Sequence, residues 1–184
     1  MAKYRHNYTY DYEKKSRNKR FIRRLIPILI ILLAGFGTYL GLDFIQEKPV
    51  LEGPYEVSKV VDGDTVEIDF NGNIERLRFI GIDCPESVHP EEEKNSPEGK
   101  MASHFTKSIL EDADIYLEWD VQIRDQYCRL LAYAYLDDQK TMVNALIVAE
   151  GYATAYTVQP NSKYSDKFRK LEKEARTREK GFWA

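Results

Sequence analysis

Cysteine is scarce in this chain of 184 residues, which contains only Cys84 and Cys128. Two cysteines are far too few for a small domain built on a disulfide framework, and no C-x-x-C pair indicates a zinc site. The sequence also lacks internal repeats and low-complexity segments. At this length we expect one ordinary domain with a short extension, and thirteen tyrosines help to supply a packed core.

Positive charge is scarce beyond the first 24 residues. Residues 1–24 hold nine Lys and Arg against two acids, whereas residues 25–184 hold 18 Lys and Arg against 28 Asp and Glu. Such an acidic domain does not bind nucleic acid through broad counterion release, because that mode needs many cations. If the domain handles phosphates, we expect it to do so through a few placed cations together with a metal ion.

One long hydrophobic run, LIPILIILLAGFGTYLGL at residues 25–42, contains no charged residue. As a helix it would span roughly 27 Å, close to the hydrocarbon thickness of a bilayer. The basic cluster KKSRNKRFIRR precedes the run, and Asp43 and Glu47 follow it. By the positive-inside rule, residues 1–24 form a cytoplasmic tail, residues 25–45 a transmembrane signal-anchor in the lipid bilayer, and the rest lies outside the cell.

A cleaved signal peptide is the alternative, because Ala34, Gly35 and Gly37 provide small residues near a possible cleavage region. The protein would then be secreted. A buried soluble helix is a third interpretation. With either a signal-anchor or a cleaved signal peptide, the domain that follows is exported from the cell. Residues 46–54, with two prolines and a glycine, are expected to be a linker, and residues 55–184 the folded domain.

Hydrophobic periodicity predicts an α+β domain, in which a small closed antiparallel barrel carries helices on its surface. Met101, Phe105 and Ile109 are expected to form the buried stripe of the first helix. The predicted strands span residues 55–61, 65–70, 74–82, 115–121 and 130–136, and the predicted helices begin at Pro97 or span residues 142–150 and 163–180, with Phe168, Leu171 and Ala175 buried in the last.

Three short stretches combine residues suited to phosphate chemistry: DGDT at 62–65, RFIGIDCPE at 78–86 and DQYCR at 125–129. Carboxylate oxygens suit Ca²⁺ or Mg²⁺, and planar guanidinium groups bind two phosphate oxygens at once. A further carboxylate can orient or deprotonate an attacking water. Each piece alone has an ordinary interpretation, since an Asp-Gly pair is more often only a turn and a strand arginine is usually a surface charge.

The order of four longer motifs adds a resemblance. VVDGDTVEI, RLRFIGIDCPE, DQYCRLLAYAYLDD and MVNALIVAEGYA resemble the successive signatures of the staphylococcal nuclease (thermonuclease) family, over about residues 57–183. The resemblance implies a five-stranded OB-fold β-barrel with three helices. It also implies calcium-dependent hydrolysis of phosphodiester bonds in DNA and RNA, by water, leaving 3′-phosphate ends.

The resemblance further implies a role for each matching residue. One Ca²⁺ would be held by the carboxylates of Asp64 and Asp83 and by the backbone carbonyl of Cys84, with Asp62 behind these ligands. Arg78 and Arg129 would bind the scissile phosphate, and Glu86 would act as general base or position the water. Tyr127 and Tyr156 would flank the nucleotide.

Four positions depart from the family pattern. Cys84 replaces a threonine, although a backbone carbonyl ligand does not depend on the side chain. Cys128 replaces a glycine beside Arg129, which constrains the turn if that position needs a positive φ. Gln126 replaces a lysine that binds phosphate, and Val158 replaces a tyrosine of the base-stacking surface.

The two cysteines flank predicted site residues in a domain expected to face an oxidising exterior. A disulfide between Cys84 and Cys128 would brace the site, with two free thiols as the alternative, because sequence does not give their Cα separation.

Retention of every acid and arginine that the reaction needs favours a nuclease at the outer cell surface. The alternative is a catalytically inactive OB-fold module that binds nucleic acid or protein, a kind of domain that commonly loses these residues. We expect a monomeric catalytic domain with no obligate protein partner. The sequence leaves open the preference for DNA or RNA.

Overall fold

The computed structural model describes residues 26–27, 48–87, 95–111 and 113–184. Two compact units divide the chain, Met1–Lys48 and Pro49–Ala184. The predicted cytoplasmic tail and nearly all of the predicted span at 25–45 lie outside the described residues. Among those that are described, no helix has both the length and the apolar character needed to cross a bilayer. The membrane anchor therefore stays a prediction.

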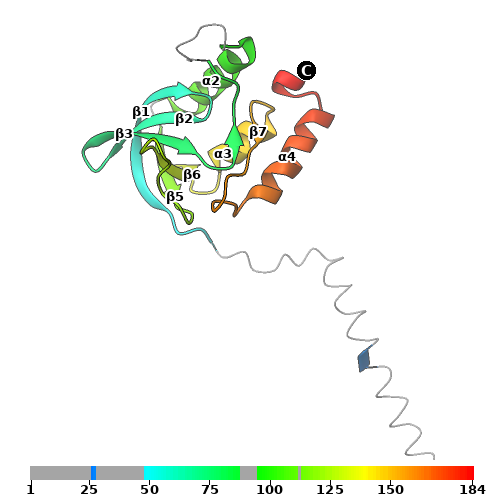
Figure 1. Ribbon diagram of the computed structural model, residues 1–184, viewed down its shortest axis with the longest axis horizontal. Helices are drawn as coiled ribbons and strands as arrows, with labels where there is room; N and C mark the ends of the chain where they lie inside the picture. Colours follow the sequence, from blue (N-terminus) through cyan, green and yellow to red (C-terminus); the bar gives the residue numbers. More distant parts are fainter. Residues whose placement is uncertain (1–25, 28–47, 88–94, 112) are drawn as a thin grey trace, which may run out of the picture. The chain divides into compact units, whose positions relative to one another are not determined.

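The second unit is built on a closed five-stranded barrel with the strand order β1-β2-β3-β6-β5 (Figure 1). Its strands are β1 (Glu52–Asp62), β2 (Thr65–Phe70), β3 (Asn73–Phe79), β5 (Asp114–Glu118) and β6 (Leu130–Leu136). The predicted bounds of β2 and β6 are confirmed. β1 begins three residues earlier than predicted, within the predicted linker, and β5 ends three residues earlier.

The barrel is closed, as predicted, but it is not wholly antiparallel. β3 and β6 pair in parallel, with Arg78 opposite Leu131, whereas the other four pairings are antiparallel. Parallel strands need a long crossover connection, and here α2 (Pro97–Leu110) and β5 lie between them in the chain. This pairing brings the C-terminal end of β3 beside the segment that leads into β6.

The predicted strand at 74–82 is wrong as one element, because the chain turns between Phe79 and Ile82. The short strand β4 (Ile82–Asp83) leaves the barrel and pairs with β7 (Thr154–Ala155). Gly81 makes the turn with a φ of 82°, a left-handed conformation that costs a glycine little. A Cβ at Gly81 would lie 2.5 Å from the ring of Phe168, so the turn also packs directly on α4 (Ser165–Thr177).

In the described part of the second unit, three helices lie outside the barrel, as predicted: α2, α3 (Val143–Ala149) and α4, followed by the short 3-10 helix η2 (Gly181–Trp183). α2 packs against β1, and α4 packs against α3 and β7 (Figure 1). Ser96 caps α2 by accepting a hydrogen bond from the backbone of Gly99 at 2.9 Å. In α3, the buried Asn144 accepts from the Ala134 amide and donates to the Ile80 carbonyl, both at 2.9 Å.

The predicted stripe of α2 is confirmed in part, because Phe105 and Ile109 are partly buried against the core. Met101 is 45% exposed, and the fully buried positions are Gly99, Ala102, Thr106 and Leu110. The Thr106 hydroxyl donates to the Gly63 carbonyl at 2.6 Å, and small residues let the helix approach the turn between β1 and β2 closely. In α4, burial of Phe168 and Ala175 is confirmed, while Leu171 is only partly buried.

Gly81→Ala should destabilise the fold by about 3 kcal/mol, because alanine has both a left-handed backbone penalty and a clash with Phe168. Urea unfolding of the variant measures this difference. Gly72→Ala is the control, since Gly72 also has a positive φ of 85° but no neighbour within 4 Å of an added Cβ. Equal losses in the two variants would show that packing on Phe168 contributes nothing.

Candidate active site

The turn between β1 and β2 buries two carboxylates. Asp62 and Asp64 are 8% and 4% exposed. Asp64 accepts hydrogen bonds from the Thr65 hydroxyl at 3.0 Å and from the Cys84 amide at 2.8 Å. Asp62 instead accepts from the Gly63 amide at 2.8 Å and from the Ser87 hydroxyl at 2.6 Å. Asp64 therefore faces the segment after β4, while Asp62 fixes the residue that follows Glu86.

Arg78 joins Asp64 to Asp83. Its guanidinium forms an ion pair with Asp64, and its Nη2 donates to Asp83 Oδ1 at 2.7 Å and to the Ile82 carbonyl at 3.3 Å. The side chain of Arg78 is mostly buried, whereas that of Asp83 is half exposed. One carboxylate from the turn before β2 and one from β4 thus converge on one cation, and the group of three keeps a net negative charge.

Arg129 is held by Asp125. Its Nε donates to Asp125 Oδ2 at 2.7 Å, and its backbone amide donates to Asp125 Oδ1 at 2.9 Å. The Tyr127 amide also donates to Asp125 Oδ1, at 2.9 Å. Burial raises the pKa of Asp125, but the hydrogen bonds from Arg129 and from the Tyr127 amide outweigh it, so the net pKa lies below its ordinary value.

Both arginines open into one cleft of about 500 Å³. The predicted substrate-binding residues Tyr127 and Tyr156 line it as well, and these residues are 71% and 55% exposed. The guanidinium of Arg129 lies 5.6 Å from the centre of the Tyr127 ring. Asp125 also lines the cleft. The other lining residues are uncharged: Phe79, Ile80, Gly81, Ile82, Gln122, Gln126, Leu131, Val158, Gln159 and Asn161.

The predicted general base, Glu86, does not line this cleft. It is exposed and lies in the segment between β4 and α2. Its backbone carbonyl accepts from the Ser96 amide at 3.0 Å, and an added Cβ at Gly99 would lie 2.2 Å from that oxygen. The start of α2 therefore fixes the backbone of Glu86, and the hydrogen bond between Ser87 and Asp62 fixes the next residue.

The proposed disulfide is absent, because both cysteines are free. Cys84 is buried, with its sulfur 2.8 Å from the position of an added Cβ at Gly63, and burial raises the pKa of its thiol. Cys128 is exposed in the turn before β6 and has a φ of 64°. This position thus has the positive φ that would constrain the turn, and a residue other than glycine occupies it here.

The predicted ligands fit a hard divalent cation. Asp64, Asp83 and the Cys84 carbonyl all present oxygen, the donor that Ca²⁺ prefers. Asp64 and Asp83 share Arg78 as a partner, and together the three side chains leave one negative charge uncompensated. Within the described residues no group of three or more His, Cys, Asp or Glu side chains could hold a metal. The remaining ligands would therefore come from backbone, water or substrate.

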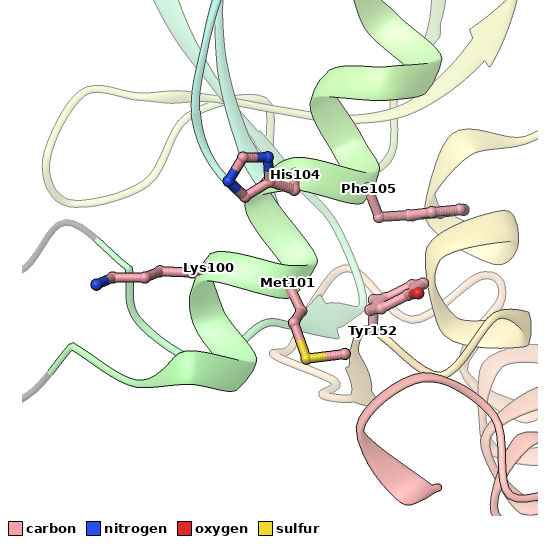
Figure 2. A pocket seen from close by; sticks show the side chains of 5 residues that line it. All are labelled: Lys100, Met101, His104, Phe105 and Tyr152. Atoms are coloured by element: carbon pink, nitrogen blue, oxygen red, sulfur yellow. The ribbon is translucent and has the colours of Figure 1, made fainter.

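A second hollow, of about 400 Å³, lies between α2 and the segment that follows α3. Lys100, Met101, His104 and Phe105 line it together with Tyr152, and the rings of Phe105 and Tyr152 are stacked 4.5 Å apart (Figure 2). In Figure 2 the side chains of Lys100 and His104 point away from this aromatic pair. No predicted site residue lies here, so we assign the chemistry to the cleft.

Sequence reasoning gave Asp125 no role, although it organises the turn that carries Tyr127 and Arg129. The DQYCR motif did contain an indication of this role, because an acid four residues before an arginine can accept hydrogen bonds from both the side chain and the backbone amide of that arginine. A pattern of this kind does not distinguish a turn from a helical ion pair, because both use the same spacing.

Asp125→Asn should lower the free energy of unfolding by about 2 kcal/mol near pH 7, because it removes charge-assisted hydrogen bonds from a mostly buried carboxylate. The folded pKa of Asp125 is lowered. Its contribution is therefore present above the unfolded pKa of about 4 and is lost as the pH falls through the folded pKa. Urea unfolding from pH 7 to pH 3 measures the difference.

The exposed Asp137 provides the control, as Asp137→Asn should leave stability nearly unchanged throughout. A gap between wild type and Asp125→Asn that stays constant down to pH 3 would contradict the assigned interaction.

Comparisons with known proteins identify the family of this chain. The profile of the family described as "Staphylococcal nuclease homologue" matches residues 76–184. The chain is 41% identical over 172 residues to "Thermonuclease" of Staphylococcus hyicus, covering 89% of this chain and 99% of that protein. It is 42% identical over 129 residues to "Thermonuclease" of Staphylococcus intermedius, covering 70% of this chain and 75% of that one.

A third relative is the "SPbeta prophage-derived endonuclease YokF" of Bacillus subtilis (strain 168), 38% identical over 133 residues, with 70% of this chain and 43% of that protein covered. The family profile spans more than half of the chain, and the Staphylococcus hyicus relative matches over nearly its whole length. The resemblance drawn from the motifs is confirmed, and this chain belongs to the staphylococcal nuclease homologue family.

Proposed function

We propose that this chain is a calcium-dependent nuclease that hydrolyses phosphodiester bonds of DNA and RNA and leaves 3′-phosphate ends. The observation that carries the proposal is the pair of arginines in one cleft, Arg78 and Arg129, each oriented by carboxylates. The names of the relatives, two thermonucleases and an endonuclease, support it.

The arginines suit the charge that develops during hydrolysis. Each planar guanidinium can donate two parallel hydrogen bonds to a phosphoryl group, and in this cleft each already has its direction fixed. Donors that are oriented before the reaction stabilise developing charge without reorganising at that moment. Arg78 and Arg129 would therefore bind the scissile phosphate from two sides of the cleft.

Asp64, Asp83 and the Cys84 carbonyl would hold one Ca²⁺, which when bound supplies positive charge beside the phosphoryl oxygens. Asp62 would act through Ser87, by keeping the backbone beside Glu86 in place. Glu86 would orient the attacking water or accept its proton while the water oxygen bonds to phosphorus. The bond from phosphorus to the 5′ oxygen would break, and that oxygen would leave as a hydroxyl with a proton from solvent.

Tyr127 and Tyr156 would flank the nucleotide. Their exposed rings stand on the cleft wall, where nucleic-acid bases can stack on them or pack against their edges. Val158, 57% exposed on the same wall, offers an apolar contact without a ring face. Bases would therefore be held mainly by two tyrosines.

The decisive test is cleavage of single-stranded DNA by the full-length chain, with Ca²⁺ or with EGTA. We expect cutting only with Ca²⁺, and losses of about a hundredfold or more in kcat for Glu86→Gln and Arg129→Ala, because each removes a group that acts on the transition state. End analysis of the products should find 3′-phosphates.

The matched control is Arg169→Ala on the outer face of α4, where an exposed ion pair with Asp166 has no contact with the cleft. It should cut like wild type. A folded wild-type chain that binds DNA but does not cut it under Ca²⁺ would instead establish the inactive binding module.

We further propose that the nuclease acts at the outer cell surface, anchored by residues 25–45 with residues 1–24 in the cytoplasm. The uncharged run and its basic flank support this orientation. Extracellular Ca²⁺, at roughly millimolar levels, would fill even a weak oxygen site.

Protease treatment of intact bacterial cells tests the location. We expect the folded domain to be accessible from outside, and the intact 21.5 kDa chain to stay in the membrane fraction after carbonate extraction. A shorter chain in the medium would establish signal cleavage and secretion. An intact chain in the soluble cytoplasmic fraction would refute export.

A further inference from the structure

The turn that carries Arg129 contains a conformation that its residue does not favour. Cys128, directly before Arg129, has a φ of 64°. The left-handed region is uncommon for residues other than glycine, because Cβ crowds the backbone there. Without other constraints, this turn would have alternative backbone conformations within reach, and each would redirect the arginine that follows.

Arg124 provides such a constraint. Its Nη1 donates to the carbonyl oxygen of Cys128 at 2.8 Å, on the strained residue itself. The same guanidinium binds Glu75 in the bidentate manner, with Nη1 to Oε2 at 2.5 Å and Nη2 to Oε1 at 2.9 Å. Glu75 belongs to β3, the barrel strand that also carries Arg78. One guanidinium thus connects the strained turn to the barrel wall.

This clamp, formed by Glu75 and Arg124, completes what Asp125 begins. Asp125 accepts hydrogen bonds from the Tyr127 amide and from the amide and Nε of Arg129, so its contacts within the turn set the shape of the turn. None of those bonds attaches the turn to β3. The clamp does so on the side of the turn that precedes Arg129, while the pairing of Leu130 and Leu131 with β3 holds the side that follows it.

The clamp is suited to orientation more than to stability. The side chains of Arg124 and Glu75 are 40% and 26% exposed, and ion pairs that water reaches add little to the free energy of unfolding. A bidentate pair of planar groups nevertheless has a defined direction. The neighbouring pair between Arg76 and Glu67 has a single contact of 3.5 Å and no bond to the turn.

We propose that Arg124 and Glu75 are positioning residues, which hold the Cys128 turn so that Arg129 and Tyr127 face the cleft. For activity, this inference rests on the proposed nuclease function. A loss of the clamp would then lower the rate of cleavage through Arg129, while the folded state stays intact.

The test compares Arg124→Ala, Arg124→Lys and the control Arg76→Ala in the full-length chain. We expect Arg124→Ala to lower kcat for single-stranded DNA by about tenfold, because small displacements of a catalytic group have large effects on rate. KM should change less than kcat. The kcat of Arg124→Lys should lie between those of wild type and Arg124→Ala, since lysine keeps the positive charge but cannot form the bidentate pair. The midpoint of thermal unfolding should shift by no more than about 3 °C.

A second readout is independent of activity. Hydrogen exchange of the Tyr127 and Arg129 amides should be faster in Arg124→Ala, by about fivefold or more, and unchanged in Arg76→Ala. Adding Cys128→Gly to Arg124→Ala should recover part of kcat, because glycine adopts the left-handed conformation without the clamp.

Equal kcat and equal exchange in Arg124→Ala and Arg76→Ala would overturn the proposal. The proposal would also be overturned if Arg124→Ala and Arg76→Ala both lost kcat in proportion to their loss of folded protein, and if Cys128→Gly recovered none of it. If wild type itself cuts no nucleic acid, the proposed function fails, and the exchange rates alone then decide whether the clamp holds the turn.

Discussion

The ion pairs of Arg78 with Asp64 and Asp83 are the interaction on which the site depends. They join the turn after β1 and the end of β3, which also share a backbone hydrogen bond from Phe79 to Asp64, to the short strand β4. Because Asp64 is buried, its charge needs partners, and it finds them in Arg78, the Thr65 hydroxyl and the Cys84 amide. Removing Arg78 would leave this carboxylate without its cation, so the pair has a structural role in addition to the one proposed for it in catalysis.

The parallel pairing of β3 with β6 provides the second constraint. It places the segment before β6, with Arg129, on the same side as Arg78, and so creates a cleft with two cations. Around this cleft the support comes from outside the barrel. Asn144 of α3 joins the Ile80 carbonyl to β6, and Phe168 of α4 packs against Gly81. The helices therefore fix the β3–β4 turn that forms one wall.

Charge in the cleft is sparse and directed. Among the described residues that line it, the basic ones are Arg78 and Arg129, and both have carboxylate partners, while glutamine and asparagine supply much of the polar wall. This agrees with the acidic composition of residues 25–184. A cleft of this kind gains little from counterion release, so recognition would depend on a few oriented contacts and on the two exposed tyrosines.

The sequence by itself determined the closed barrel with three helices, because alternating strands, the Asn-Gly turn and capped helices are local patterns. It also pointed to Asp64, Arg78, Asp83 and Arg129 as one chemical set, since their order matches a family of known proteins. The tertiary structure decided what local patterns cannot encode. The parallel pairing, the break at Gly81 and the buried face of α2 all follow from contacts between distant segments.

The two cysteines and the clamp illustrate the same division. The positions of the cysteines in the sequence allowed a disulfide. Packing, however, buries Cys84 beneath the Asp62–Asp64 turn and leaves Cys128 exposed on the turn before β6. Likewise, nothing in the sequence joins Glu75 to Arg124, which are 49 residues apart. Only the closure of the barrel brings them within hydrogen-bond distance, because it places β3 beside the segment that leads into β6.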